Sequence, residues 1–199
     1  MKLYIKQKII NPESLQEVLE NTEQEYEQAS LYNSKKKSHV DKDVRSTWVK
    51  NIKFQDYPEI EHALATLIGI LDDQKDPMDY HMLEMQVLKY GKGDHFKYHR
   101  DIIIKDDKHE KTLGRRAYSA STILYQSEDL QGGEFDIWTK DKEGSVKHRV
   151  PLEVGETILF DSYTYHQVNQ VKQGTRISLV TWLYLRNKYT DEARYRVDI

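Results

Sequence analysis

The stretch MQVLKYGKGDHFKYHRD, residues 85–101, decides the fold of this chain. Its first six residues mix apolar and β-branched side chains as strands do, and the Gly91–Asp94 segment ends that pattern with a turn. His99 and Asp101 follow the turn. Residues two apart in an extended chain point to the same face, so both side chains can be directed at one point while Arg100 faces away. The order strand, turn, His-x-Asp therefore predicts a metal site built on a β-sheet.

The region from residue 82 to residue 185 has the pattern of short strands separated by glycine turns. Alternating and β-branched residues predict strands over Ala117–Tyr125, Glu156–Phe160 and Thr175–Leu185, and Gly132-Gly133 predicts a tight turn. We therefore expect a β-rich core over residues 82–185.

The first 80 residues have a different pattern, which predicts helices. Asn11 is a good N-cap and Pro12 suits a first helical position, so a helix is expected from Pro12 to about Leu31. A second helix is expected over Pro58–Leu71. Its apolar side chains lie on one face: Ile60, Leu64, Leu67, Ile68 and Leu71. Residues 1–80 are thus predicted to support the sheet from one side.

Helices followed by many short strands indicate an α+β fold. We expect a double-stranded β-helix, the cupin-like jelly roll, as the core, buttressed by the N-terminal helices. The 199 residues suit a single domain over residues 1–199 by the usual domain size of roughly 100–200 residues.

Composition narrows the classes of function. The net charge is −3 and charges of both signs make up 32% of the chain, so we expect neither nucleic acid nor a membrane as partner. There are no cysteines, so any metal must be held by His and carboxylate ligands. With no signal-peptide pattern and no long apolar run, cytoplasmic residence is the expectation. The oligomeric state is left open by the sequence.

The predicted metal ligands are His99, Asp101 and His166. Two imidazoles and one carboxylate on strands match the facial triad of non-haem Fe(II), which leaves coordination positions open for a co-substrate and O2. Zinc would favour Cys or a third His, although other divalent ions can occupy the same ligands. The pair His39 and Asp41 repeats the local spacing, but it lies in a charged stretch without a preceding strand and is interpreted as a chance match.

The chain also resembles the prolyl 4-hydroxylase-like branch of the 2-oxoglutarate/Fe(II)-dependent dioxygenase superfamily, over about residues 82–185. The matching motifs keep the family's order: Gln86–Gly91, Phe96, Thr122–Tyr125, Gly132–Glu134, Gly155, Leu159-Phe160, His166, Gly174–Arg176 and Trp182. The resemblance implies Fe(II) as cofactor, with 2-oxoglutarate and O2 as co-substrates. It implies oxidative decarboxylation to succinate and CO2, coupled to hydroxylation of a C–H bond.

Co-substrate binding is assigned to four residues. A guanidinium can hold the distal carboxylate of 2-oxoglutarate in two hydrogen bonds. Arg176 lies among the apolar residues of a predicted strand, and a cation buried there would need an anionic partner. The resemblance implies that Tyr90 and Tyr125 line or bind the co-substrate. In a regular strand Thr122 and Tyr125 face opposite sides, so we prefer Tyr125 and retain Thr122 as the second choice. Arg176 joins the three metal ligands as a predicted catalytic residue.

The substrate is less well defined by the sequence. Val44-Arg45-Ser46 resembles a segment that precedes the core of prolyl 4-hydroxylases, so Arg45, Ser46 and Trp48 are candidate substrate residues. This segment and the charged insertion Lys105–Arg116 are predicted to close over the pocket.

Peptidyl proline is the first choice of substrate. A free amino acid or another small molecule is the alternative, since Ile102–Ile104 are apolar where the family often has polar or aromatic residues. A non-enzymatic alternative is a metal-binding jelly-roll sensor without turnover. Arg176 argues against that sensor, which would have no use for a buried guanidinium beside the metal.

Overall fold

A computed structural model of the protein describes residues 4–22, 26–32, 38–102, 116–140 and 144–185. Two α-helices lie near the N-terminus of this part of the chain, α1 (Pro12–Glu20) and α2 (Pro58–Leu71). Two short 3₁₀ turns flank α2, η1 (Phe54–Asp56) and η2 (Pro77–Asp79). None of the helices described is long and apolar enough to cross a membrane.

The larger sheet has seven strands, and neighbouring strands are antiparallel. Their spatial order is β1 (Tyr4–Gln7), β13 (Thr157–Asp161), β9 (Arg116–Gln126), β16 (Arg176–Leu185), β7 (Tyr80–Tyr90), β6 (Trp48–Ile52) and β2 (Glu27–Gln28). The long strand β16 lies at the centre, paired along its length with β7 and β9.

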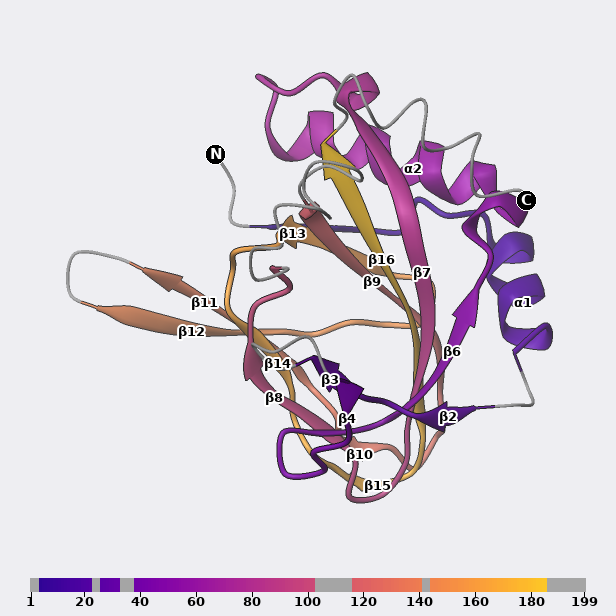
Figure 1. Cartoon of the computed structure of the whole chain (residues 1–199), viewed down its shortest axis with the longest axis vertical. Helices are drawn as coiled ribbons and strands as arrows, with labels where there is room; N and C mark the ends of the chain where they lie inside the picture. The colour runs from indigo at the N-terminus through magenta and orange to yellow at the C-terminus, as the bar shows by residue number, and fades with distance from the viewer. Residues whose placement is uncertain (1–3, 23–25, 33–37, 103–115, 141–143, 186–199) are drawn as a thin grey trace.

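The smaller sheet has five antiparallel strands and carries the outward-pointing hairpin seen in Figure 1. Their spatial order is β12 (Ser145–Val150), β11 (Phe135–Lys140), β14 (His166–Val168), β8 (His95–His99) and β5 (Arg45–Ser46). Two further pairs of short strands complete the fold, β3 (Leu31–Tyr32) with β4 (Ser38–His39), and β10 (Gln131–Gly132) with β15 (Val171–Gln173).

The larger sheet lies between the helices and the smaller sheet (Figure 1). Its helix-facing side chains, including Met85 and Leu179, pack with α1 and α2 in one hydrophobic cluster. Its other face packs against the smaller sheet in a second cluster that contains Leu88, Ile158 and Ile137. Alternate residues of each central strand thus face two different interiors, as the two-residue period of a strand requires.

The predicted strands of residues 82–185 are confirmed, and so is the α+β double-sheet architecture. The turn at Gly132-Gly133 is confirmed by positive φ angles of 80° and 71°. Any side chain at Gly132 would collide with the backbone carbonyl of Gln170, because β15 passes directly beside it. Glycine is therefore required there for the crossing of β10 and β15.

The second predicted helix is confirmed, while the first ends earlier than expected. All five predicted apolar residues of α2 are buried. α1 ends at Glu20 instead of continuing to about Leu31. The residues that follow form no apolar stripe, and the Thr22 hydroxyl donates a hydrogen bond to the Val18 carbonyl at 2.8 Å. Gln28 and Leu31 belong to strands instead.

The expectation of a purely helical support over residues 1–80 is wrong in one respect. Strands β1 to β6 also lie in this region, and four of them extend the two main sheets: β1, β2, β5 and β6. Strands of two to five residues carry too little periodicity to be recognised locally, because their pairing partners are distant in sequence. The segment of β5 and β6 matters most, since it brings Arg45 to the smaller sheet.

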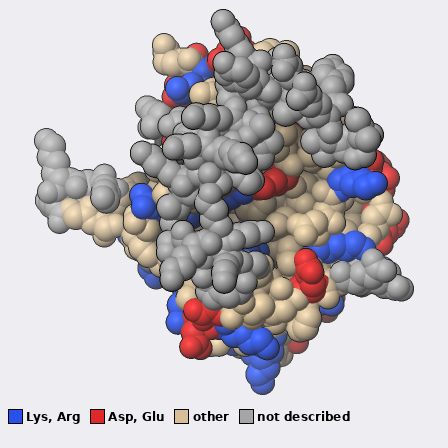
Figure 2. Space-filling view, in the orientation of Figure 1, with Lys and Arg blue, Asp and Glu red and all other residues tan. Residues whose placement is uncertain are grey.

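Basic and acidic side chains of the described residues are interspersed on the face shown in Figure 2, without a large area of one sign. This distribution agrees with the small net charge of −3.

Candidate metal centre

Three predicted ligands meet between the two sheets. His99 is the last residue of β8 and His166 the first of β14, and the two are directly paired across these strands. Asp101 lies two residues beyond β8, where its backbone N–H donates to the Ser162 carbonyl at 3.1 Å. Asp101 is thus positioned by a loop contact rather than by the continuous strand that we expected.

The ligand atoms lie close enough together to bind one ion. Nε2 of His99 is 3.4 Å from Oδ1 of Asp101, and Nε2 of His166 is 3.5 Å from Oδ2 of the same carboxylate. The candidate ligand atoms of all three residues lie within 4.8 Å of one another. Among the described residues, this is the one group of three or more His, Cys, Asp or Glu with such spacing.

Backbone contacts orient both imidazoles. Nδ1 of His99 lies 2.6 Å from the Lys97 carbonyl, and Nδ1 of His166 lies 3.0 Å from the Thr164 carbonyl. Each Nδ1 must therefore carry the proton that it donates to its carbonyl, which leaves the Nε2 lone pair directed at the centre. This is the orientation that metal-binding histidines require.

The protonation states suit a cation. Burial, together with the charge of His99, lowers the pKa of His166 to about 4, although Asp101 opposes the shift. Burial alone would raise the pKa of Asp101, but His166, His99 and Arg116 outweigh it and hold that pKa well below its usual range. At neutral pH the centre therefore offers a neutral His166 and an ionised Asp101, and this donor set fits Fe(II).

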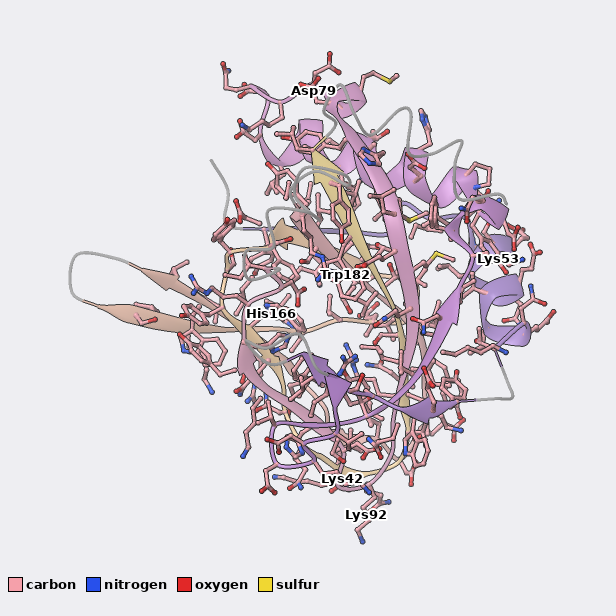
Figure 3. All side chains as sticks on the ribbon, viewed as in Figure 1. Lys42, Lys53, Asp79, Lys92, His166 and Trp182 are labelled. Carbon is pink, nitrogen blue, oxygen red and sulfur yellow. The ribbon has the colours of Figure 1, made fainter. Side chains whose placement is uncertain are left out.

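Two residues of the larger sheet hold Asp101 in place. Trp182 of β16 donates from its indole Nε1 to Oδ2 of Asp101 at 3.0 Å (Figure 3 labels Trp182 and His166). Arg116 of β9 donates to the Asp101 backbone carbonyl at 3.1 Å, and its guanidinium lies 4.2 Å from the Trp182 ring centroid. Arg116 itself is paired with Glu84.

Sequence reasoning assigned no role to Trp182 or to Arg116. Trp182 carries a usable signal, because it is an even number of residues from Arg176 on the same strand and so shares its face. Arg116 was interpreted only as the end of a charged insertion.

Arg176 is buried on the face of β16 that meets the smaller sheet. It is 1% exposed; its Nη1 donates to Ser178 Oγ at 3.0 Å, and its Nη2 has no hydrogen-bond partner. Tyr90 of β7 pairs with Arg176, and the guanidinium carbon lies 5.5 Å from the phenol ring centroid. Burial lowers the pKa of Arg176, which Tyr90 opposes. A guanidinium still charged and short of one acceptor is suited to a carboxylate ligand.

Tyr125 and Thr122 do not reach this site. Thr122 pairs with Leu179, whose side chain belongs to the helix-side cluster, and its hydroxyl bonds to Thr157 at 2.7 Å. Tyr125 is 42% exposed and pairs with Ile177, which also packs on the helix side. A β-bulge between these two pairs keeps both side chains off the face that carries Arg176. The expectation that one of them faces inward is therefore corrected.

The three candidate substrate residues lie in different environments. Arg45 lies beside the centre, with its guanidinium carbon 4.6 Å from the ring centroid of Phe96, which stacks on His99. The hydroxyl of Ser46 donates to Asp94 at 2.6 Å and so fixes the turn before β8. Trp48 is 43% exposed, on the face of β6 opposite to the buried Val49. The predicted lid Lys105–Arg116 lies outside the described residues except for Arg116.

The chain belongs to the 2OG-Fe(II) oxygenase superfamily, whose family profile matches residues 85–184. This span contains both sheets' central strands, the three candidate ligands and Arg176. Membership confirms the family prediction, and it implies Fe(II), 2-oxoglutarate and O2 for this class of enzyme.

Curated relatives are similar over the same region. A PKHD-type hydroxylase of Psychrobacter sp. is 32% identical over 94 residues, which are 47% of this chain and 35% of that protein. A PKHD-type hydroxylase of Hyphomonas neptunium is 30% identical over 121 residues, 61% of this chain and 51% of that protein. The chain thus matches about half or less of the length of these relatives.

Solved structures share the fold. A Pseudomonas putida prolyl-4-hydroxylase superposes with a TM-score of 0.64 at 18% identity, covering 92% of this chain and 93% of that one. A viral collagen prolyl hydroxylase from Paramecium bursaria Chlorella virus-1 gives a TM-score of 0.62 at 18% identity, covering 92% and 96% of the two chains. These likenesses establish the double-stranded β-helix.

Proposed function

We propose that this protein is an Fe(II)- and 2-oxoglutarate-dependent hydroxylase that acts on peptidyl proline. The observation that carries the proposal is the combination of the open triad with a buried guanidinium short of one acceptor on the facing sheet. A metal site alone needs no such guanidinium, whereas 2-oxoglutarate needs both a metal and a cationic partner.

The metal would be held by Nε2 of His99, one carboxylate oxygen of Asp101 and Nε2 of His166. When bound, Fe(II) supplies the O2 activation that the decarboxylation of 2-oxoglutarate and the hydroxylation require. The protein's own part is to keep His166 neutral by burial and to keep Asp101 ionised, with the guanidinium of Arg116 among the groups that lower the pKa of that carboxyl. Trp182 prevents the carboxylate from rotating away, because it occupies Oδ2 with a hydrogen bond.

Arg176 would bind the distal carboxylate of 2-oxoglutarate. Its Nη2 is the donor without a partner, and Ser178 already fixes its other terminal nitrogen. Tyr90 lies beside the guanidinium, and burial raises its pKa against the opposing charges of Arg45 and Arg176. A neutral phenol at this place is a suitable second donor to the same carboxylate.

Peptidyl proline is proposed from the relatives. The curated relatives are named PKHD-type hydroxylases, and several similar structures are of prolyl hydroxylases. One further structure of this fold is of an epimerase, SnoN, so the fold by itself does not select hydroxylation of proline. We propose cytoplasmic residence as well; the chain has no cysteines and so needs no oxidising compartment for disulfides.

The test is anaerobic loading with Fe(II), followed by 2-oxoglutarate, O2 and proline-containing peptides. We expect succinate to form and the peptide to gain the mass of one oxygen atom. Mass gain on free amino acids but on no peptide would replace the peptide substrate by a small molecule. Metal binding without binding of 2-oxoglutarate would instead indicate the non-enzymatic sensor.

A further inference from the structure

A second guanidinium lies beside the metal centre, on the smaller sheet. Arg45 is in the edge strand β5 and pairs with Phe96 of β8. Its guanidinium carbon lies 4.6 Å from the Phe96 ring centroid, and that ring stacks on the His99 imidazole at 3.5 Å with an interplanar angle of 14°. One aromatic ring therefore separates this cation from a candidate metal ligand.

Arg45 has no polar partner in the part of the chain that the structure describes. Its Nε is buried without a hydrogen bond, and among the described residues its guanidinium stacks on the ring of Phe96. Arg116, the other arginine beside Asp101, is paired with Glu84. Burial lowers the pKa of Arg45, against the opposing effects of Tyr90 and Asp101, yet an arginine remains charged in proteins. Arg45 is half-buried, and a partly buried cation without a polar partner is suited to an anionic ligand.

The charges of the site leave room for one more anion. Arg45 and Arg176 are two cations and Asp101 is one anion, which gives an excess of one positive charge. A divalent metal adds two positive charges and 2-oxoglutarate two negative ones, so the excess persists after both have bound. Arg176 lies on the facing sheet and meets the distal carboxylate in the proposed function. Arg45 is then the cation without a counterion.

We propose that Arg45 binds a carboxylate of the substrate, so that the preferred substrate carries an acidic group close to the carbon that is hydroxylated. This inference rests on the proposed function and adds the charge of the substrate to it. The carboxylate can come from a free amino acid or a peptide C-terminus, or from an acidic side chain next to the target residue. In each case a carboxylate of the substrate accepts hydrogen bonds from the guanidinium of Arg45.

The test compares matched acids and amides. The protein is loaded with Mn(II) and the unreactive 2-oxoglutarate analogue N-oxalylglycine, and binding is measured by calorimetry. The probes are L-proline against L-prolinamide, and acetyl-Ala-Pro-Asp-amide against acetyl-Ala-Pro-Asn-amide. The first pair tests whether Arg45 binds a main-chain carboxylate, and the second pair tests whether it binds an acidic side chain.

We expect one acid to bind at least about 30-fold more tightly than its amide, as the loss of a buried charge partner implies. Arg45→Met should remove the preference and Arg45→Lys should retain part of it. Arg100→Met is the matched control, because Arg100 is the neighbour of His99 that stacks on Tyr165 instead, and this variant should keep the preference. Without ligands, Arg45→Met should also melt at a higher temperature than the wild-type protein, which loss of a merely structural arginine would not produce.

Equal binding of acids and amides by the wild-type protein would overturn the inference, as would absence of binding by both acids. Retention of the preference in Arg45→Met would overturn it too. If Arg45→Met instead weakens binding of 2-oxoglutarate to the Mn(II)-loaded protein, Arg45 serves the co-substrate and the inference is wrong, while the proposed function stands. Failure of the wild-type protein to bind 2-oxoglutarate would contradict the proposed function itself, and that measurement needs none of the acid probes.

Discussion

Trp182 donates a hydrogen bond from its indole to Oδ2 of Asp101 at 3.0 Å, and this contact joins the two sheets at the metal centre. The tryptophan lies on the same strand and the same face as Arg176. Strand β16 therefore positions a candidate metal ligand and carries the candidate co-substrate cation. We therefore expect substitution of Trp182 to affect metal binding and substitution of Arg176 to affect co-substrate binding.

Replacing Trp182 with Phe should weaken metal binding about 10- to 100-fold, the usual cost of removing a partner that orients a ligand. The ring remains while the donor is lost, so the fold should be retained. Mn(II) titration by calorimetry measures the effect. Trp138→Phe is the control, because Trp138 lies in β11 and contacts Tyr98 and Lys147 rather than a ligand. Equal affinity in the wild-type protein and Trp182→Phe would show that this hydrogen bond does not support the centre.

Replacing Arg176 with Met should have opposite effects on stability and on binding. The ligand-free protein should become more stable, because a buried and incompletely paired charge is removed. Binding of 2-oxoglutarate should weaken about 30-fold or more. Thermal unfolding and calorimetry on Mn(II)-loaded protein measure the two effects, and Arg176→Lys should recover part of the affinity. Unchanged affinity for 2-oxoglutarate in Arg176→Met would exclude this residue as the co-substrate cation.

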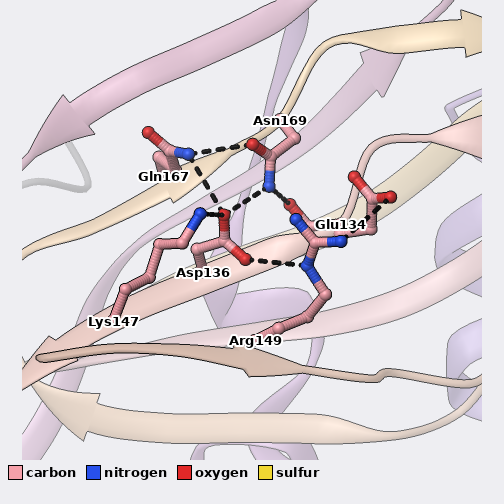
Figure 4. Close-up of polar contacts among 6 residues, drawn as sticks. All are labelled: Glu134, Asp136, Lys147, Arg149, Gln167 and Asn169. Atoms are coloured by element: carbon pink, nitrogen blue, oxygen red, sulfur yellow. Dashed lines mark hydrogen bonds and ion pairs between the residues drawn. The ribbon is translucent and has the colours of Figure 1, made fainter.

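Asp136 is the centre of a polar network on the outer face of the smaller sheet (Figure 4). Its fully buried carboxylate accepts from four side chains, at distances of 2.6–3.3 Å: Asn169, Arg149, Gln167 and Lys147. Burial alone would raise the pKa of Asp136, but these hydrogen bonds outweigh it and lower that pKa. The network therefore stabilises the fold above the unfolded-state pKa of about 3.9, and this contribution is lost as the pH falls through the lower folded-state pKa.

Asp136→Asn should accordingly lower the free energy of unfolding by about 2 kcal/mol at pH 7. Its difference from the wild-type protein should shrink as the pH falls from about 4 toward 2, since the wild-type carboxylate is then protonated. Urea unfolding across this pH range provides the measurement. Asp73→Asn, at an exposed position after α2, controls for general charge effects. A difference that stays constant with pH would rule out the ionised carboxylate as the source of stability.

Much of this fold could be predicted because its signals are local. The apolar stripe of α2, the alternation in β7, β9 and β16, and the turn before β8 each lie within a dozen or so residues. The spacing of His99 and Asp101 is also a local signal, because an extended chain between them is enough to direct both side chains to the same face. His166 is predicted as the third ligand by its residue type, and the structure places it opposite His99.

The remaining features depend on contacts that no short segment encodes. The end of α1 and the short edge strands follow from pairing with distant strands. Tyr125 does not face inward as predicted, because a bulge changes which residues of β9 face the smaller sheet, and a bulge leaves no pattern in one strand alone. The positions of Trp182 and Arg116 beside Asp101 likewise arise only when β16, β9 and the loop after β8 meet.

The central claim is that His99, Asp101 and His166 support oxidation coupled to 2-oxoglutarate. The most direct measurement is the fate of isotopically labelled O2 in a reaction with Fe(II), 2-oxoglutarate and the best-binding probe. We predict one labelled oxygen atom in succinate and one in the hydroxylated product with the wild-type protein, and neither with His99→Ala or Asp101→Ala. Labelled succinate and product from both variants, or no label in the succinate formed by the wild-type protein, would contradict the account.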